Sequence, residues 1–276
     1  IKGAIGPASA SFAVRGIEQA QQHGAQLIVL EMDTPGGLDK SMRDIIQAIL
    51  ASPVPVATYV YPGGARAASA GTYILYASHI AAMAPGTNLG AATPVAIGGT
   101  PGAPPQQPAG DKSDKSDKQA DGEAEQAPGD AMSKKQINDA SAYIRGLAQM
   151  RGRNAEWAEQ AVRQAVSLAA EEALKLKVID YVARDLPDLL RQLDGKRFTA
   201  AGVEAKLQTA DAVVVSHAPD WRTRLLAVIT NPSVALLLMM IGVYGLFFEF
   251  SNPGTGVGGV LGGICLILAM YALQLL

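Results

Sequence analysis

Blocks of apolar residues and amphipathic stretches alternate along the first 94 residues of the chain. Short apolar runs predict buried strands at Ile1–Ile5, Gln26–Met32, Val56–Val60 and His79–Met83. Helices are predicted between them at Ser9–His23, along the apolar stripe of Met42, Ile45, Ile46, Ile49 and Leu50, and at Ser69–Ser78. This order predicts an α/β fold with a largely parallel sheet flanked by helices.

Two glycine-rich turns follow predicted strands. DTPGG (residues 33–37) comes after the second strand, and GGARAASAG (residues 63–71) comes after the third. Ligand sites in such folds lie at the carboxyl ends of the strands. We therefore expect the two turns to meet at one site.

Two charge-free stretches dominate the C-terminal end: Val234–Phe248 and Val257–Leu276. Their length and composition predict two transmembrane helices joined by SNPGTG, while the alternative is a buried hairpin in a larger soluble core. The chain ends within apolar sequence, so we expect the native protein to continue. Arg222 and Arg224 precede the first span, which by the positive-inside rule favours a cytoplasmic soluble domain.

Residues 98–129 form a segment rich in Pro, Gly and charged residues, with alanine as its only apolar type. Such a composition cannot compensate for the entropy of ordering, so we interpret it as a flexible insertion. We expect a soluble domain in two parts, residues 1–97 and 132–218, interrupted by the insertion at 98–131. A membrane segment at 219–276 follows.

Charge and cysteine content exclude some functions. The formal net charge is −2 and no run of Lys or Arg exceeds two, so we expect no nucleic-acid partner. The single cysteine, Cys265, lies in an apolar stretch and can form no internal disulfide. Cysteine chemistry is therefore not expected.

Ser69 is the candidate nucleophile, because it follows a strand at a predicted helix start and is flanked by small residues. The Ala70 amide at that helix N-terminus, with the Gly37 amide from the other turn, would form an oxyanion hole. The alternative is that Ser69 is only an N-cap in a stretch of small residues that packs closely. The residues alone leave both interpretations open.

The base for such a serine is not an obvious histidine, since His23, His79 and His217 all lie at unsuitable places in the predicted fold. A lysine with a lowered pKa can take the serine proton instead. Lys134 and Lys135 fit this role, at the point where the insertion ends and a helix begins. Their alternative role is a solvated helix start.

Three segments, DTPGG, YPGGARAASAGTYI and HIAAMAPGTNLGAATPV, resemble the NfeD-type membrane-bound serine proteases of the ClpP/crotonase superfamily. The resemblance continues through INDASAYIRGLAQMRGRN and the C-terminal spans, and leaves only the insertion unmatched. It implies a ClpP/crotonase-like soluble domain built as a repeated ββα superhelix, followed by C-terminal transmembrane helices. It also implies a serine–lysine dyad of Ser69 and Lys135, an oxyanion hole of Gly37 and Ala70, and no metal or cofactor.

The function implied by the resemblance is a serine endopeptidase that cuts hydrophobic segments, including those of stomatin-type (SPFH) membrane proteins. We expect an extended substrate to pair with the backbone at Gly36 and Leu38 beside Gly37. Lys135 is expected to be ordered only when a substrate or partner binds. A homodimer or higher homo-oligomer in a bacterial-type plasma membrane is implied, with the protease domain outside the cytoplasm.

Two other functions stay open. One is a non-catalytic membrane scaffold that assembles with stomatin-type proteins, for which the dyad is irrelevant. The other is a crotonase-like acyl-CoA enzyme, which shares the architecture and also uses two backbone amides as an oxyanion hole. The acyl-CoA enzyme has little need for Ser69 or for membrane spans.

Overall fold

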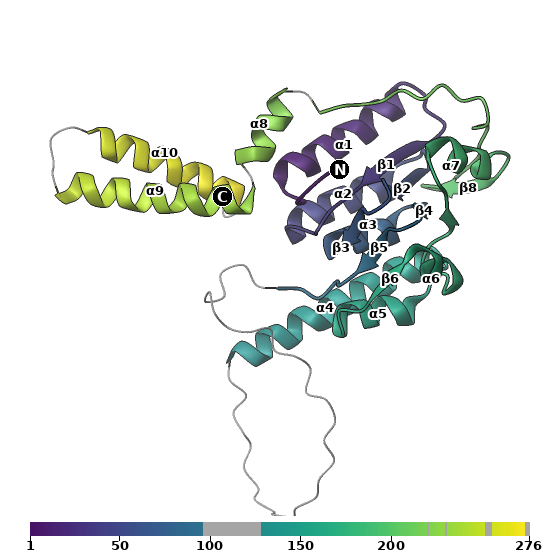
Figure 1. The fold of residues 1–276 in the computed structure, drawn as a ribbon, viewed down its shortest axis with the longest axis horizontal. Helices are drawn as coiled ribbons and strands as arrows, with labels where there is room; N and C mark the ends of the chain where they lie inside the picture. Colours follow the sequence, from purple (N-terminus) through teal and green to yellow (C-terminus); the bar gives the residue numbers. More distant parts are fainter. Residues whose placement is uncertain (96–127, 220, 230, 252–255, 274–276) are drawn as a thin grey trace, which may run out of the picture.

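A computed structural model describes residues 1–95, 128–219, 221–229, 231–251 and 256–273 (Figure 1). The strands within these ranges are β1 (Ile28–Met32), β2 (Val56–Val60), β3 (Arg66–Ala68), β4 (Ile80–Met83), β5 (Asn88–Gly90), β6 (Ser167–Ala169), β7 (Tyr181–Val182), β8 (Arg197–Ala200) and β9 (Val203–Lys206). The helices are α1 (Pro7–Gln22), α2 (Asp39–Ala51), α3 (Ala70–Ala77), α4 (Pro128–Met150), α5 (Ala155–Arg163), α6 (Ala170–Lys175), α7 (Leu186–Leu193), α8 (Trp221–Ile229), α9 (Pro232–Ser251) and α10 (Val257–Ala272).

The soluble part repeats a strand–strand–helix unit. The first strands of successive units form a parallel sheet in the order β1-β2-β4-β7, and the second strands join a smaller sheet in the order β3-β5-β6. Two units follow this rule, β2-β3-α3 and β4-β5-α4. The first unit approximates it, because Thr34, between β1 and α2, makes an isolated bridge in place of a second strand. The expected α/β fold of repeated ββα units is therefore confirmed.

Both faces of the parallel sheet are covered, and this explains why all five residues of β2 are buried. Val56 and Val60 pack into the large core with α1, α2, α3 and α4. Ala57 and Tyr59 face a second cluster with Leu189 of α7. The VATYV run, which is mostly apolar and uncharged, is the pattern that such double burial requires.

Arg153 fixes the C-terminal end of α3. Its side chain is buried and its Nη1 donates to the carbonyl oxygens of Tyr76 and Ser78, at 2.9 and 3.0 Å. Asp180 pairs with its Nη2 at 2.5 Å, so the buried charge is neutralised. These bonds satisfy carbonyls that a helix end leaves without partners and hold α3 in place, with Ser69 just before its other end.

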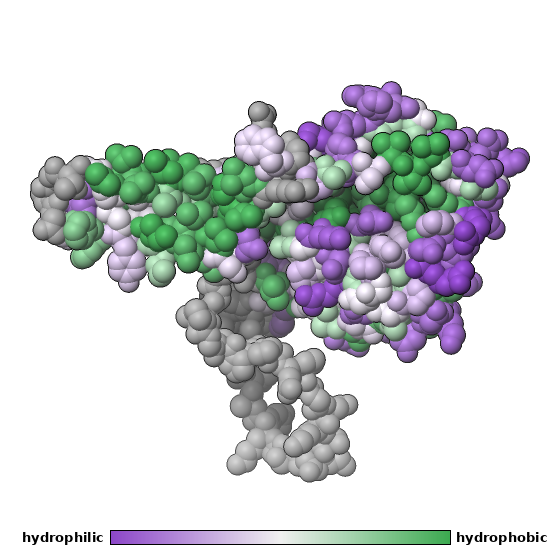
Figure 2. All heavy atoms as spheres, turned by 45° about the horizontal axis from the view of Figure 1, so that its top comes forward, coloured by the Kyte–Doolittle hydropathy of each residue, from purple (hydrophilic) through white to green (hydrophobic). Residues whose placement is uncertain are grey.

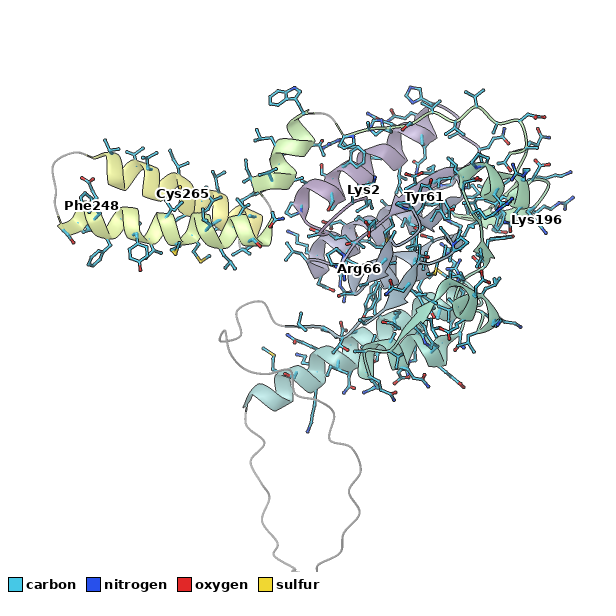
Figure 3. The ribbon with its side chains drawn as sticks, in the orientation of Figure 1. Lys2, Tyr61, Arg66, Lys196, Phe248 and Cys265 are labelled. Atoms are coloured by element: carbon cyan, nitrogen blue, oxygen red, sulfur yellow. The ribbon has the colours of Figure 1, made fainter. Side chains whose placement is uncertain are left out.

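The two C-terminal helices form an antiparallel hairpin whose surface is mostly apolar (Figure 2). Residues 233–251 are long and apolar enough to cross a membrane, while α10 is shorter. Glycines let the helices approach closely, because a Cβ on Gly245 would lie 3.2 Å from Gly262 Cα. Figure 3 shows Phe248 near the hairpin end that lies away from the soluble part.

The structure differs from the expected elements at residues 1–5 and at the start of α4. Residues 1–5 form no continuous strand, since only Lys2 and Ile5 make isolated bridges and Gly3 between them has φ +86°. Helix α4 begins at Pro128 and so includes the last residues assigned to the insertion. Residues 98–127 of the expected insertion, and the last three residues of the second expected span, lie outside the described residues.

Candidate active site

Ser69 sits in a sharp turn between β3 and α3. It is the residue before the helix, with φ +51° and ψ −117°, a conformation that is costly for any residue with a Cβ. Its N–H donates to the Gly90 carbonyl oxygen at 2.9 Å, and its own carbonyl oxygen accepts from Thr72 N–H at 2.9 Å. The backbone is therefore fixed while the side chain stays half-buried. Arg66, labelled in Figure 3, marks the start of the strand that leads to this turn.

The DTPGG turn lies directly against Ser69. A Cβ placed on Gly36 would lie 2.6 Å from Ser69 Cβ and 3.0 Å from its Oγ, so only glycine fits there. Gly37 is also restricted, since a Cβ on it would lie 2.0 Å from the Ile5 carbonyl oxygen. The expectation that the two glycine-rich turns meet is confirmed.

Thr34 holds the DTPGG turn in place, a role that the sequence analysis missed. Its buried hydroxyl accepts from Gly36 N–H at 3.0 Å and lies 3.2 Å from the Gly36 carbonyl oxygen, to which it donates. Its backbone pairs with β3, because its N–H donates to Arg66 O and its own oxygen accepts from Ala68 N–H. One residue thus ties the glycine turn to the strand that carries Ser69. A threonine two residues before a glycine in a turn was the available signal.

Two amides near Ser69 are candidates for an oxyanion hole. Within the described residues, neither Gly37 N–H nor Ala70 N–H donates a hydrogen bond to another protein group. The Ala70 amide is at the first position of α3, where the helix dipole favours negative charge. Both N–H groups therefore remain available to donate to an anion, as an oxyanion hole requires.

The backbone groups of Gly36 and Leu38 are already bonded inside the protein. Gly36 O accepts from Ile5 N–H, Leu38 N–H donates to Ile5 O, and Leu38 O accepts from Met42 N–H. These bonds restrict the strand pairing that we expected at Gly36 and Leu38. In the part of the turn that the structure describes, the Gly37 N–H is the donor left for a substrate.

The three histidines are engaged elsewhere, as expected. His79 is buried, its Nδ1 accepts from Val56 N–H at 3.2 Å, and desolvation, helped by Arg151 and Arg153, lowers its pKa to about 4. His23 Nδ1 lies 2.7 Å from the Gln19 carbonyl oxygen at the end of α1. His217 stacks on Phe12 with ring centroids 5.4 Å apart. None of them contacts Ser69.

Helix α4 places the two candidate lysines. It runs in the same direction as α3, as two contacts show. The ring of Tyr143 stacks on that of Tyr73 near the start of α3, with centroids 6.1 Å apart, and Arg151, just after the end of α4, donates to the carbonyl oxygen of Ala77 at the end of α3. Residues that precede Tyr143 therefore extend towards the N-terminal end of α3, where Ser69 lies. Arg43 of α2 also holds α4, with its guanidinium 4.4 Å from the centroid of the Tyr143 ring.

The faces of α4 distinguish Lys134 from Lys135. Both are exposed. Lys134 is seven residues before buried Ser141 and so continues the buried side of the helix, whereas Lys135 precedes exposed Ala142 by the same interval. Within the described residues, no hydrogen bond joins Ser69 Oγ to either lysine.

Comparison with known proteins identifies the family. Residues 1–205 match the family described as "NfeD1b, N-terminal domain", and residues 233–276 match the "NfeD integral membrane domain". The chain belongs to the NfeD family. It is accordingly a membrane protein, and the matched membrane domain covers α9 and α10.

Two curated relatives cover nearly all of this NfeD chain. Membrane-bound protease PH1510 of Pyrococcus horikoshii is 39% identical over 258 residues, which are 93% of this chain and 53% of the relative. Membrane protein NfeD1b of Bacillus subtilis is 30% identical over 263 residues, which are 95% of this chain and 52% of the relative. The chain thus spans about half the length of these curated relatives.

Solved structures show the same fold. One is a lysine-to-alanine variant of the 1510-N membrane-bound stomatin-specific protease in complex with a substrate peptide; it is 38% identical, covers 83% of this chain and 94% of its own, and has a TM-score of 0.68. A serine-to-alanine variant of the same protease matches with 38% identity and a TM-score of 0.66, over 80% of this chain and 95% of its own. The ClpP-like fold expected for the soluble part is confirmed.

Proposed function

We propose that this NfeD-family chain is a membrane-anchored serine endopeptidase with Ser69 as its nucleophile. The observation that carries the proposal is the strained turn of Ser69, with φ +51°, packed against Gly36. A serine that only caps a helix accepts a bond from the helix through its side chain, but Ser69 makes no such bond. The surrounding structure holds this strained backbone in place, as at many catalytic turns.

The chemistry is acyl transfer. A lysine amine removes the proton from Ser69 Oγ as the oxygen attacks a peptide carbonyl carbon, and the amides of Gly37 and Ala70 bind the oxyanion that forms. The lysine then returns the proton to the leaving amine as the peptide bond breaks. Water, deprotonated by the same lysine, attacks the acyl-enzyme, and the lysine returns this proton to Ser69 Oγ as the ester bond breaks. This sequence draws on the chain's own groups and water.

We propose Lys135 as the base, because its position in the helix resembles that of the catalytic lysine in the family. Its exposed position in the described structure supports a resting state in which the dyad is not assembled. Binding of a substrate or partner would bring the first turns of α4 against Ser69. Lys134 is the alternative, since it continues the buried side of the helix.

The proposed substrates are apolar segments of membrane-associated proteins. The relatives of known structure are named as proteases specific for stomatin, and one of them is bound to a substrate peptide. Ala68, next to Ser69, is small and half-buried, which leaves room beside the serine for an apolar side chain of a substrate. We propose that a stomatin-type membrane protein is the substrate or partner of this chain, and that the chain acts as a homo-oligomer.

We also propose how the chain is organised in the membrane. Residues 1–97 and 132–218 form one protease domain that the segment 98–131 interrupts, and residues 219–276 form a membrane segment with two spans. The hairpin of α9 and α10 supports two crossings. The protease domain lies outside the cytoplasm, as the family resemblance implies.

The function is tested by proteolysis with the full chain in lipid nanodiscs. The substrate is a synthetic peptide of the apolar C-terminal tail of a stomatin-type protein, and the products are identified by mass spectrometry. We expect cleavage by the unaltered chain and none by Ser69→Ala. Absence of cleavage by both, with retained binding of a stomatin-type protein, would favour the scaffold function instead.

A further inference from the structure

Helix α8 connects the soluble part of the chain to the first membrane helix. It runs from Trp221 to Ile229, and α9 begins at Pro232, three residues later. Figure 1 shows α8 at the end of the hairpin nearest the soluble part, running across the direction of α9 and α10 rather than along it. The position of α8 in the chain therefore places it at the surface of the bilayer that α9 enters.

The two sides of α8 differ in what they contact. Thr223 is 6% exposed and its hydroxyl lies 3.3 Å from Nη2 of Arg15 in α1, which donates to it. Trp221, Leu225 and Val228 follow one another at i, i+4 and i+7 and so share the opposite side. They are 68%, 52% and 59% exposed. One side of α8 thus packs on the soluble domain and the other presents apolar side chains outwards.

The segment before α8 is also attached to α1. His217 stacks on Phe12 with an interplanar angle of 13°, and its Cδ2 lies 3.8 Å from the Cβ position of Gly16. With the Arg15–Thr223 bond, these contacts connect His217 and Thr223 to one face of α1. These contacts hold α8 against α1, so the orientation of α8 constrains that of the domain.

We propose that α8 is an interfacial helix that lies in the membrane surface and holds the α1 face of the soluble domain against the bilayer. The apolar side of α8 contacts the lipids of the same bilayer that α9 crosses. Tryptophan favours this depth because its ring is apolar while its N–H still reaches water or headgroups. Aliphatic side chains on one side of a short helix insert at the boundary between headgroups and acyl chains.

This inference does not depend on the proposed proteolysis. It concerns how the domain is placed, and it stands or falls whether or not Ser69 is a nucleophile. If both proposals hold, a substrate segment leaving the same bilayer has only a short distance to reach the domain.

Tryptophan fluorescence tests the proposal, because the chain has only two tryptophans. Trp157 is buried in the soluble core, with 5% exposure, and Trp157→Phe leaves Trp221 as the single reporter. The full chain is placed in phosphatidylcholine nanodiscs, with lipids brominated either near the headgroup end of the acyl chains or near the bilayer centre. We expect Trp221 to be quenched at least twofold more by the shallow bromines than by the deep ones.

Two variants provide controls. The double variant Leu225→Asp/Val228→Asp should at least halve the quenching by shallow bromines, because two carboxylates oppose insertion of that side. Val213→Asp, at an apolar position that is more accessible still, with 90% exposure, should leave the quenching unchanged. The reverse variant Trp221→Phe, which reports Trp157, should show no quenching by either lipid. The proposal is overturned if Trp221 emits like free tryptophan in water and neither brominated lipid quenches it.

Discussion

Gly36 and Ser69 are in such close contact that a methyl group on Gly36 would lie 2.6 Å from Ser69 Cβ. We expect Gly36→Ala to displace Ser69 or the glycine turn and to lower kcat/KM by about 100-fold or more, as misplacements of about 1 Å do. Because Gly36 has φ +114°, the variant also loses about 1–2 kcal/mol of stability. The rate is measured with the apolar peptide substrate.

Gly24→Ala is the matched control for this variant. Gly24 also has a positive φ, +69°, but a Cβ there meets nothing within 4 Å. It should therefore lose similar stability and keep its activity. Equal activity losses in both variants would mean that strain, rather than contact with Ser69, explains the effect.

Thr34→Val is expected to loosen the glycine turn. It removes the hydroxyl that bonds both Gly36 N–H and Gly36 O, and leaves a buried N–H without a partner, which costs about 1–3 kcal/mol. We expect kcat to fall about tenfold, equivalent to ~1.4 kcal/mol of transition-state stabilisation, with little change in KM.

Two further variants distinguish an effect on the position of the glycine turn from a general loss of stability. Thr34→Ser keeps the hydroxyl and should restore most of kcat. Thr58→Val removes a buried hydroxyl that bonds Ser78 Oγ at 2.6 Å, and should reduce stability without lowering kcat. A normal kcat in Thr34→Val would show that the turn does not need this hydroxyl.

The sequence predicted those elements whose apolar positions match the surfaces that are buried in the folded protein. The VATYV run of β2 and the apolar stripe of α2 were confirmed because each reflects the surfaces that cover it. Residues 1–5 looked like a strand, but Gly3 interrupts the pairing, and composition does not reveal a backbone angle. The start of α4 was missed because residues 128–131 resemble the insertion in composition.

The candidate site was predictable only in part. The meeting of the two glycine turns followed from parallel-sheet topology, and the geometry confirmed it. The role of Thr34 depends on a side-chain bond across the turn, which the sequence does not specify. The proposed roles of Lys135, Gly37 and Ala70 stay predictions, because they concern a state with substrate bound.

The stability of the soluble domain should depend on pH through His79. Its pKa is lowered from 6.5 to about 4, so between these values the unfolded chain binds more protons than the folded one. The stability is complete above about pH 6.5 and falls by up to ~3 kcal/mol as the pH drops towards 4. His79→Asn, whose amide oxygen can accept from Val56 N–H, should show a smaller loss over this range.

This dependence is measured by urea unfolding of the full chain in nanodiscs, followed by Trp157 fluorescence in a Trp221→Phe background. An identical loss in His79→Asn would assign the effect to other groups. Because His79 is not the proposed base, the same variant should keep the reactivity of Ser69 near neutral pH.

Covalent labelling of Ser69 by a fluorophosphonate tests the central claim most directly. In the full chain in nanodiscs, with the apolar peptide present to favour assembly of the dyad, we expect tandem mass spectrometry to place the label on Ser69. Labelling should disappear in Ser69→Ala and slow at least tenfold in Lys135→Ala, while Lys134→Ala labels at close to the normal rate. A label on another residue, or labelling that persists in Ser69→Ala, would contradict the account.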